Sequence, residues 1–320
     1  MKLIISPSSD PYTNLAIEEC LLKTSLEDYI FLYVNQPCVV VGKHQITTKE
    51  INSFYINEHN ILVARRLSGG GTVFHDEGNL NFSIIKTNTS GVNISYKHLS
   101  QPIIEFLQHE GADVYLSERN DIMFKDKKVS GSAMHIYKNR AIAHGTLLID
   151  CNLKNLSSSL SSNPERFTDK SIASVPSKVM NLSEIYTNFT VGHIINQFTK
   201  FILNQYPEVS IFSIPSNYTN YIQQLAVEKY SNNDWIYGYS PKYYYKNSFD
   251  FNGSRISYQL QIEKGNINRI QIESADEVNS SIELEFKDLI GTPHNISILK
   301  SLQDLPSTTD FKMHLISSLF

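Results

Sequence analysis

Three consecutive glycines stand between two arginines and a histidine–aspartate pair in the stretch ARRLSGGGTVFHDEG. Residues Gly69–Gly71 follow Arg65 and Arg66, and His75 and Asp76 come shortly after. Glycine costs backbone entropy, so three together indicate a positive φ or a ligand lying close to bare backbone. Successive backbone N–H groups form an anion-binding nest, to which an arginine adds fixed charge. The stretch predicts an anion-binding loop, although a tight turn with exposed arginines and a structural histidine has the same composition.

A lysine that precedes small residues is the second candidate. Lys128 leads into residues 129–133, Val-Ser-Gly-Ser-Ala, and Asn120 and Asp121 offer oxygens at the start of the preceding strand-like run. Small side chains let a bulky ligand lie along the chain while the ammonium reaches an anion. His144, in the following run, can face the same place. A solvated lysine and an ordinary strand histidine explain these residue types equally well, so both interpretations stay open at this point.

The glycines and the lysine are surrounded by β-branched and aromatic runs. The first two runs are separated by Asn-Gln-Pro and predict a hairpin. Because meanders dominate over strand–helix alternation, the pattern favours a mostly antiparallel sheet over a doubly wound parallel one. The predicted strands cover residues 29–34, 38–42, 61–66, 81–85, 113–117, 121–124, 128–133 and 135–149, the last with a turn at Lys138–Asn139.

Helical signals and a second unit complete the pattern. Asp10 followed by Pro11 predicts a helix start, and Glu18 and Glu19 form its expected charged face. A small α/β unit is expected after Phe249. The remaining predicted elements are helices at residues 94–111 and 191–206, a serine-rich surface loop at 157–171, a hairpin at 256–272 and amphipathic runs at 296–302 and 311–319.

Composition limits the classes of function. The 320 residues carry a net charge of −4, so no global basic field favours nucleic acid or an anionic membrane. Cys20, Cys38 and Cys151 are far apart and odd in number, which indicates buried structural thiols in a reducing compartment. No window is apolar enough to span a bilayer, and the N-terminal apolar run is too short for a signal peptide. The sequence therefore predicts a soluble cytoplasmic protein.

Several long motifs, in order, resemble a known family. RRLSGGGTVFHDEGNLNFS, NDI…KKVSGSA and HGTLLID are similar to the three signature stretches of the lipoate–protein ligase family. Upstream, NLAIEE and VGKHQ fit the same family, and downstream SIASVPSKVMNL and WIYGYSPKY do so. The resemblance covers roughly the first three-quarters of the chain, and motifs of this length are specific.

The resemblance implies an α+β fold shared with biotin–protein ligases: a mixed, mostly antiparallel sheet with flanking helices. It implies a catalytic domain over residues 1–248 and a small α/β C-terminal accessory domain over residues 249–320. It also implies two steps, in which lipoate and ATP form lipoyl-AMP and pyrophosphate, and a lysine of an acceptor then takes the lipoyl group. The expected acceptors are apo lipoyl domains of E2 subunits and the glycine cleavage H protein.

The resemblance also implies roles for individual residues. Lys128 matches the catalytic lysine, and Arg66 matches a nucleotide-binding arginine. Asn120 and Asp121 are expected to contact the adenylate or to support the Mg²⁺ that accompanies ATP, and no separate set of metal ligands is expected. The serine-rich segment is expected to order over the adenylate. The full set of expected binding residues is Arg66, Gly69, Gly70, Gly71, Thr72, Val73, Phe74, His75, Asn120, Asp121, Lys128 and His144.

Two other functions remain compatible with the sequence. The same fold hosts octanoyl or lipoyl acyltransferases that work through a cysteine thioester without ATP, and such an enzyme needs a reactive, exposed thiol. Cys151, directly after HGTLLID, is the candidate closest to the motifs. The third possibility is a non-catalytic protein that binds lipoate or an adenylate.

Overall fold

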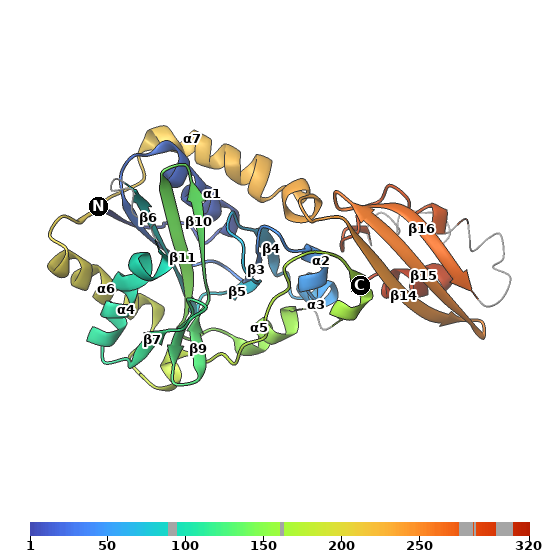
Figure 1. Ribbon diagram of the computed structural model, residues 1–320, viewed down its shortest axis with the longest axis horizontal. Helices are drawn as coiled ribbons and strands as arrows, with labels where there is room; N and C mark the ends of the chain where they lie inside the picture. Colours follow the sequence, from blue (N-terminus) through green and yellow to red (C-terminus); the bar gives the residue numbers. More distant parts are fainter. Residues whose placement is uncertain (89–94, 161–162, 275–283, 285, 299–309) are drawn as a thin grey trace. The chain divides into compact units, whose positions relative to one another are not determined.

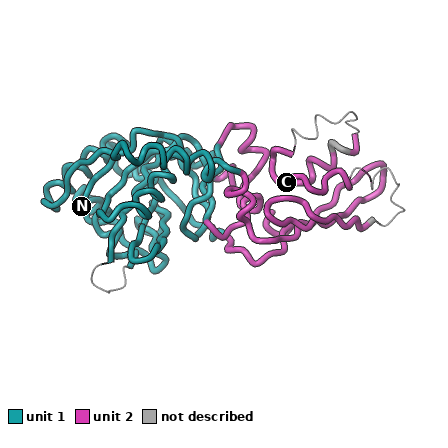
Figure 2. The backbone as a smooth tube through the Cα atoms, turned by 90° about the horizontal axis from the view of Figure 1, so that it is seen from above, with its two compact units in different colours: residues 1–42, 62–156, 174–232 teal, residues 43–61, 157–173, 233–320 magenta. Residues whose placement is uncertain are grey.

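The computed structural model describes residues 1–88, 95–160, 163–274, 284, 286–298 and 310–320. Two compact units share the chain (Figure 2): unit 1 contains residues 1–42, 62–156 and 174–232, and unit 2 contains residues 43–61, 157–173 and 233–320. The boundary expected near Phe249 falls inside strand β14 (Tyr243–Phe251), and unit 2 also takes two earlier segments. The division of catalytic and accessory roles between residues 1–248 and 249–320 stays a prediction.

A six-stranded mixed sheet forms the centre of unit 1 (Figure 1). Strand β1 runs parallel to β2 and β13, and the other neighbours are antiparallel. The hairpin predicted around Lys138 is confirmed as β10 and β11. The mixed sheet with helices confirms the predicted α+β class. In spatial order the strands are β10 (Ser132–Tyr137), β11 (Arg140–Leu148), β6 (Asn79–Thr87), β2 (Tyr29–Tyr33), β1 (Lys2–Ile5) and β13 (Ser210–Ile211).

Helices bury both faces of this sheet, which explains why every residue of β2 is buried. Ile30 and Leu32 join the apolar cluster that includes α4 (Tyr96–His109) and α6 (Val191–Gln205). Alternation sends Tyr33 to the opposite face, where its hydroxyl donates to Glu18 of α1 (Pro11–Thr24) at 3.0 Å. Helix α7 (Ser216–Leu225) packs against α1, and a π-helical turn, η3 (Ala226–Tyr230), follows it (Figure 1).

Helix α1 begins as predicted but its charged face is wrong. The Asp10 side chain accepts from the N–H of Thr13, and Pro11 is the first helical residue. Glu18 and Glu19 are nevertheless buried, with 3% and 2% of their surfaces exposed. Partners from distant elements make this possible, because a buried carboxylate is tolerated when it is paired and hydrogen-bonded. Glu19 accepts from Lys23, Lys229 and Tyr230 at 2.6–2.7 Å.

Strand β3 (Cys38–Val41) does not pair with β2, so the predicted hairpin is wrong. It lies between β4 (Leu62–Arg65) and β5 (Val73–His75) in a separate three-stranded sheet. Asn35, in the connecting turn, is fully buried and accepts from Asn14 of helix α1 at 2.8 Å. This anchor fixes the turn on helix α1, and the chain continues into a different sheet. Strands β7 (Val114–Leu116), β8 (Ile122–Phe124) and β9 (Lys127–Ser130) form a further small sheet.

A four-stranded sheet organises unit 2, in the order β12 (Phe167–Thr168), β14, β15 (Ser254–Glu263) and β16 (Asn266–Ser274). The predicted hairpin is confirmed, and its turn residues Lys264 and Gly265 both have positive φ. Helix α10 (Asp310–Ser318) confirms the last amphipathic run, whereas residues 299–302 of the preceding run lie outside the described residues. The short helices α2 (Thr47–Glu50) and α3 (Ser53–Glu58) also belong to unit 2.

The serine-rich segment has regular structure, so the predicted loop is wrong for its described residues. Helix α5 (Leu153–Ser159) extends into it, and a 3-10 turn, η1 (Pro164–Arg166), leads into β12. Phe167 of this strand packs on the apolar cluster of the unit 2 sheet. Ordering of the segment over an adenylate stays a prediction.

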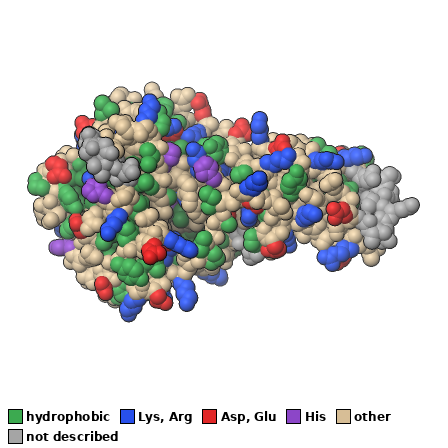
Figure 3. Space-filling view, in the orientation of Figure 1, with side chains coloured by type: hydrophobic (Ala, Val, Ile, Leu, Met, Phe, Trp, Pro, Cys, Tyr) green, Lys and Arg blue, Asp and Glu red, His purple; other side chains and the backbone are tan. Residues whose placement is uncertain are grey.

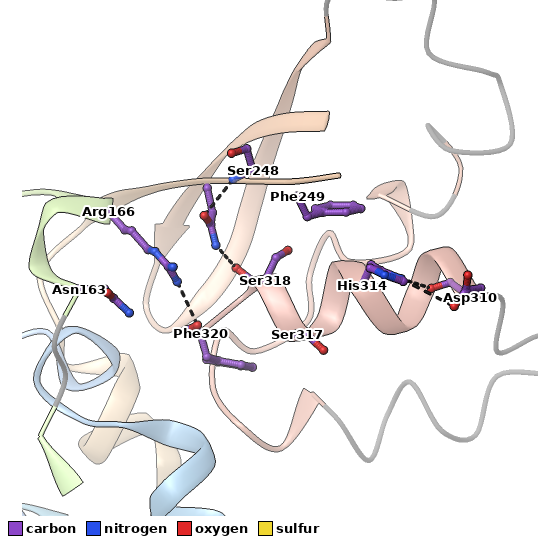
Figure 4. Close-up of a pocket in the computed structure, with 10 residues that line it drawn as sticks. Asn163, Arg166, Ser248, Phe249, Asp310, His314, Ser317, Ser318 and Phe320 are labelled. Atoms are coloured by element: carbon purple, nitrogen blue, oxygen red, sulfur yellow. Dashed lines mark hydrogen bonds and ion pairs between the residues drawn. The ribbon is translucent and has the colours of Figure 1, made fainter. Parts of the chain in front are cut away.

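A cavity of about 540 Å³ lies within unit 2 (Figure 4). The Arg166 guanidinium donates to the carbonyl of Phe320 at 3.1 Å, and the Asn247 amide donates to the carbonyl of Ser318 at 2.7 Å. These bonds hold helix α10 beside β14 and the 3-10 turn. None of the residues predicted from the sequence to bind ligand lines this cavity.

His294 is a buried neutral histidine in unit 2. Its Nε2 donates to the carbonyl of Leu319 at 3.0 Å, so its Nδ1 accepts from the Tyr243 hydroxyl at 2.7 Å. Burial lowers the pKa of His294 to about 4. The unfolded chain takes up this proton below about pH 6.5, whereas the folded chain does so only near pH 4. Stability therefore falls as pH drops through this window.

We expect His294 to lower the free energy of unfolding by about 2 kcal/mol at pH 5 relative to pH 7. Urea unfolding at both pH values measures this difference. His294→Gln keeps a donor and an acceptor without titrating, so its pH dependence should be smaller by that amount. Equal pH dependence in the variant and the parent would contradict the assignment.

Charges of both signs lie on the surface, and the described helices are short or polar. On the face in Figure 3, basic and acidic side chains are interspersed, in line with the small net charge of −4. Within the described ranges, every helix is too short or too polar to cross a membrane.

Candidate active site

Arg66 holds the glycine loop through its guanidinium. Its Nη2 donates to the carbonyls of Gly69 and Gly71 at 2.7 Å each, and its Nε donates to the Ser68 hydroxyl at 3.0 Å. Gly70, between these carbonyls, has φ +86°, and a Cβ there would lie 3.1 Å from Nη2. The backbone conformation therefore favours glycine at this position, and a Cβ would also press against the Arg66 guanidinium.

The two neighbouring arginines go to different places, as expected for residues with opposite side-chain directions. Arg65 is fully buried and its Nη1 donates to the carbonyl of Gly42 at 3.0 Å. Arg66 is 6% exposed and faces the loop. Burial lowers the pKa of Arg66 to about 10, against the opposing effect of Glu18 and Tyr33. The Arg66 guanidinium therefore stays charged at neutral pH beside the glycines.

The downstream stretch SIASVPSKVMNL lies against both candidate motifs. The N–H of Thr72 donates to the Ser174 hydroxyl at 2.9 Å, at the end of the glycine loop. Four residues further on, Lys178 accepts at its carbonyl from the N–H of Lys128 at 2.8 Å, and Met180 donates to the carbonyl of Lys128 at 3.1 Å. One extended segment thus ties the glycine loop to the lysine strand.

The Lys128 ammonium lies at the junction of the two motifs. Its Nζ is 2.9 Å from Asp121 Oδ1, and the two side chains are only 22% and 17% exposed. A Cβ at Gly131 would lie 3.6 Å from Nζ and 3.3 Å from Cγ1 of Val73, which follows the glycine loop. The structure therefore brings the lysine and the loop together. The alternative of a fully solvated lysine is wrong for Lys128, although it holds for the exposed Lys125.

Asn120 shapes the turn before Asp121. It is exposed and has φ 65°, in the left-handed region that asparagine tolerates. Its carbonyl accepts from the hydroxyl of Ser132, at the start of β10. The structure thus gives Asn120 a backbone role, and its predicted contact with an adenylate stays a prediction.

His144 reaches the glycine loop through a buried network. Its Nε2 lies 2.6 Å from the Ser68 hydroxyl, which also accepts from Arg66, and its Nδ1 lies 3.0 Å from Glu18 Oε2. Burial opposes ionisation of Glu18, but the charge and hydrogen bond of His144, with hydrogen bonds from Ser83 and Tyr33, hold its pKa below the usual value. An ionised carboxylate therefore lies beneath the arginine and the histidine.

Sequence reasoning missed Glu18 and Ser68 as parts of the site. The helical pattern places Glu18 on a charged face, and nothing in the sequence pattern singles out Ser68. The available signal was the run NLAIEECLL, in which two carboxylates interrupt a helix that is otherwise apolar. Charged residues in such a run are buried only with partners, and partners at a distance mark a functional or structural network.

His75, on β5, is 4% exposed and its Nδ1 lies 3.0 Å from Asn35 Nδ2. Burial lowers the pKa of His75 to about 3, with further contributions from the charges of Arg66 and His144. Phe74 points to the other face of the strand and is buried in the core. Of the predicted binding residues, the structure gathers those on the loop, Lys128, Asp121 and His144 around one region of unit 1.

The three cysteines are free and buried. Burial raises the pKa of Cys20, Cys38 and Cys151, and Asp76 contributes to the shift at Cys151. A protonated, buried thiol is a poor nucleophile. Among the described residues, no group of three His, Cys, Asp or Glu side chains could hold a metal ion.

Comparison with known proteins agrees with this geometry. Residues 10–203 match the family described as the lipoyl protein ligase A/B catalytic domain. The lipoate-protein ligase LplJ of Bacillus subtilis (strain 168) is 36% identical over 275 residues, which cover 82% of this chain and 81% of that protein. Lipoate–protein ligase 1 of Staphylococcus aureus (strain Mu50) is 36% identical over 269 residues, with the same coverage of 82% and 81%.

Solved structures share the fold. The crystal structure of P. falciparum LipL1 in complex with lipoate has a TM-score of 0.63 and 25% identity, and the match covers 99% of this chain and 98% of that one. Lipoate-protein ligase A bound with ATP has a TM-score of 0.64 and 22% identity, and the match covers 74% of this chain and 98% of that one. These matches confirm the predicted ligase-like fold. The family model and the sequence matches show that the chain belongs to the lipoate–protein ligase family.

Proposed function

We propose that this chain is an ATP-dependent lipoate–protein ligase. It joins lipoate to AMP with release of pyrophosphate and then transfers the lipoyl group to a lysine of an acceptor lipoyl domain. The observation that carries the proposal is the convergence of the half-buried Lys128 ammonium with the glycine loop held by Arg66. Family membership and the fold of relatives crystallised with lipoate or ATP support it.

In the first step a carboxylate oxygen of lipoate attacks the α-phosphorus of ATP, and negative charge grows on the phosphate oxygens. Lys128 supplies a fixed cation, and the loop supplies backbone N–H donors of Gly69, Gly70 and Gly71. Such preorganised groups stabilise developing charge best where water is excluded. Arg66 acts by shaping the loop, because its Nη2 is engaged by two loop carbonyls.

In the second step the amine of the acceptor lysine attacks the acyl carbonyl, the bond to the phosphate oxygen breaks and AMP leaves. The Lys128 ammonium then stabilises the negative charge on the acyl oxygen and afterwards that on the leaving phosphate. The apolar part of lipoate needs a slot, which the partly exposed Val73 helps to line, whereas Val129 is buried in the core. We assign this chemistry to the N-terminal part of the chain and an accessory role to residues 249–320.

The residues that the structure describes do not form a dedicated Mg²⁺ site. Asp121 offers one carboxylate, and it is already paired with Lys128. We therefore assign Mg²⁺ to the phosphate oxygens of the incoming ATP. The acceptors are apo lipoyl domains of E2 subunits and the glycine cleavage H protein, and the compartment is the cytoplasm, where the three free thiols would stay reduced.

Pyrophosphate release tests the proposal. The 320-residue chain is incubated with ATP, Mg²⁺ and lipoate, first without and then with purified apo lipoyl domain. Release without acceptor, followed by a mass gain of one lipoyl group on the acceptor lysine, is the expected result. Lipoylation that proceeds without ATP would favour the acyltransferase alternative, and binding without release in either reaction would favour the non-catalytic one.

The thioester alternative predicts sensitivity to thiol reagents. We expect treatment of the folded chain with iodoacetamide to leave ATP-dependent activity unchanged, because Cys151 is only 4% exposed and its pKa is raised by burial. Mass spectrometry of the treated protein reports which thiols react. Cys151→Ala should likewise keep its activity, and loss of activity in that variant would revive the thioester route.

Gly70→Val is expected to raise the KM for ATP by about 10-fold or more, and to raise that for lipoate less. Valine strains a residue at φ +86° and meets the Arg66 guanidinium, so the phosphate loop is displaced. Steady-state pyrophosphate release with each substrate varied in turn separates the two effects. Equal loss for both substrates would point to general misfolding.

A further inference from the structure

A chain of buried amides runs from the start of helix α1 to His75. Nδ2 of Asn14 donates to the carbonyl of Ser8 at 3.0 Å and to Oδ1 of Asn35 at 2.8 Å. Nδ2 of Asn35 in turn lies 3.0 Å from Nδ1 of His75. Both asparagines are fully buried, and His75 is 4% exposed. Three side chains distant in sequence thus form one continuous hydrogen-bonded line.

The direction of this line is fixed by its first members. A backbone carbonyl only accepts, so the group of Asn14 that faces Ser8 is the NH₂. The Ser6 hydroxyl donates to Asn14 Oδ1 at 2.6 Å, which agrees with this orientation. Asn35 therefore presents its oxygen to Asn14 and its NH₂ to His75. Because an amide NH₂ only donates, Nδ1 of His75 accepts and the ring proton resides on Nε2.

The resulting Nε2–H of His75 is shielded from solvent and has no acceptor among the described residues. A buried donor without a partner costs about 1–3 kcal/mol. Such groups are rare in native proteins and need an explanation. The relay therefore holds a neutral N–H donor in place at a cost to stability.

The donor lies beside the groups of the proposed reaction. Val73 and His75 are two residues apart on β5 and share a face of the strand. Val73 contacts the Gly131 position next to the Lys128 ammonium. His75 is also close enough to Arg66 for the charge of the guanidinium to lower the pKa of His75. The reactants expected here carry anionic oxygens on the carboxylate and on the phosphates.

We propose that Asn14 and Asn35 form a tautomer relay that holds His75 as an Nε2–H donor to an anionic oxygen of the bound reactants. The oxygen belongs either to the carboxylate of the acid or to a phosphate of the nucleotide. His75 is the group that touches the reactant, and the two asparagines are positioning residues. The proposal rests on the proposed ligase function.

Nitrogen NMR tests the relay directly in the wild-type chain. The protein is labelled with ¹⁵N-histidine, and two-bond proton–nitrogen correlations report the tautomer of each of the 10 histidines. His75→Gln identifies the His75 signals by their loss. We expect the Nε2–H form at pH 8. An Nδ1–H form in the wild type would overturn the proposal.

Asn35→Asp tests the consequence for the reaction. A carboxylate accepts, so the ring proton should move to Nδ1 and Nε2 should lose its proton, since burial and Arg66 disfavour the doubly protonated ring. We expect kcat/KM for pyrophosphate release to fall about 10- to 100-fold. A larger rise of KM for lipoate assigns the oxygen to the carboxylate, and a larger rise of KM for ATP assigns it to the phosphate. An inverted tautomer with unchanged kinetics would overturn the proposal.

Matched variants separate this effect from misfolding. Asn247→Asp makes the same substitution in unit 2, where the amide donates to Ser318, and should leave kcat/KM unchanged. Asn14→Asp breaks the relay one step earlier and should give a smaller loss than Asn35→Asp. His75→Gln retains an amide donor, so adding Asn35→Asp to it should cost little; a full additional loss would overturn the relay. A wild-type chain with the Nε2–H form but no pyrophosphate release would contradict the ligase function itself.

Discussion

Replacing Lys128 by alanine is expected to lower the rate of pyrophosphate release by about 10²- to 10³-fold, with the fold intact. The ammonium lies between Asp121 and the Gly131 position, beside the residue that follows the glycine loop. Arg66 is committed to the loop carbonyls, so it does not replace this ammonium. Single-turnover pyrophosphate release measures the effect on the first step alone.

Lys127→Ala is the matched control for this prediction. Lys127 precedes Lys128 on the same strand, is exposed and points to the other face. The Lys127→Ala variant should release pyrophosphate at the unchanged rate. Its midpoint of thermal unfolding should equal that of Lys128→Ala. Near-normal pyrophosphate release by Lys128→Ala would falsify the catalytic role of this lysine.

Gly78→Ala should lower the free energy of unfolding by more than about 3 kcal/mol. A Cβ at this position would lie 2.0 Å from the carbonyl oxygen of Asp150 and 2.6 Å from the nitrogen of Cys151. These backbone atoms lie just after β11, where the carbonyl of Gly78 accepts from the N–H groups of Ile149 and Asp150. The clash would therefore push the turn that contains Gly78 away from the segment that follows β11. Urea unfolding followed by circular dichroism measures the loss.

Gly192→Ala provides the comparison for Gly78. Gly192 lies in the first turn of helix α6, and a Cβ there meets no atom within 4 Å. Alanine should leave stability unchanged or raise it by up to about 1 kcal/mol, through a better helix propensity. If both alanine variants lost stability to the same extent, the packing argument for Gly78 would be wrong.

Local patterns predicted most elements because they are set by neighbours in sequence. The β-branched run of β3 and the strand-like runs of β10 and β11 each predict a strand from their own residues. Strand partners were less predictable. Asn35 looks like an ordinary turn residue, yet its contacts with Asn14 and His75 make the turn part of a buried network. No short-range signal reports a partner that lies tens of residues away.

The candidate site divides in the same way. The glycine loop and Lys128 could be predicted from short-range patterns. Three consecutive glycines cost backbone entropy and therefore indicate a function, and a lysine followed by small residues leaves room for a ligand. Glu18 could not, because helical periodicity treats a carboxylate as solvent-facing. Its burial depends on hydroxyls of Tyr33 and Ser83 and on His144, which three different strands deliver. A carboxylate's surroundings follow from the tertiary fold and not from its own segment.

The interleaving of the two units has a consequence for how the protein can be dissected. The chain passes from one unit to the other at 42/43, 61/62, 156/157, 173/174 and 232/233. A truncation after residue 248 would remove the last three residues of β14 and all of β15 and β16. It would also remove partners of α2 and α3, because Thr48 donates to the carbonyl of His294 and Phe54 packs against Phe320. Neither unit is therefore excisable by one cut, and insertions or fusions are best placed at the chain ends rather than at a presumed linker.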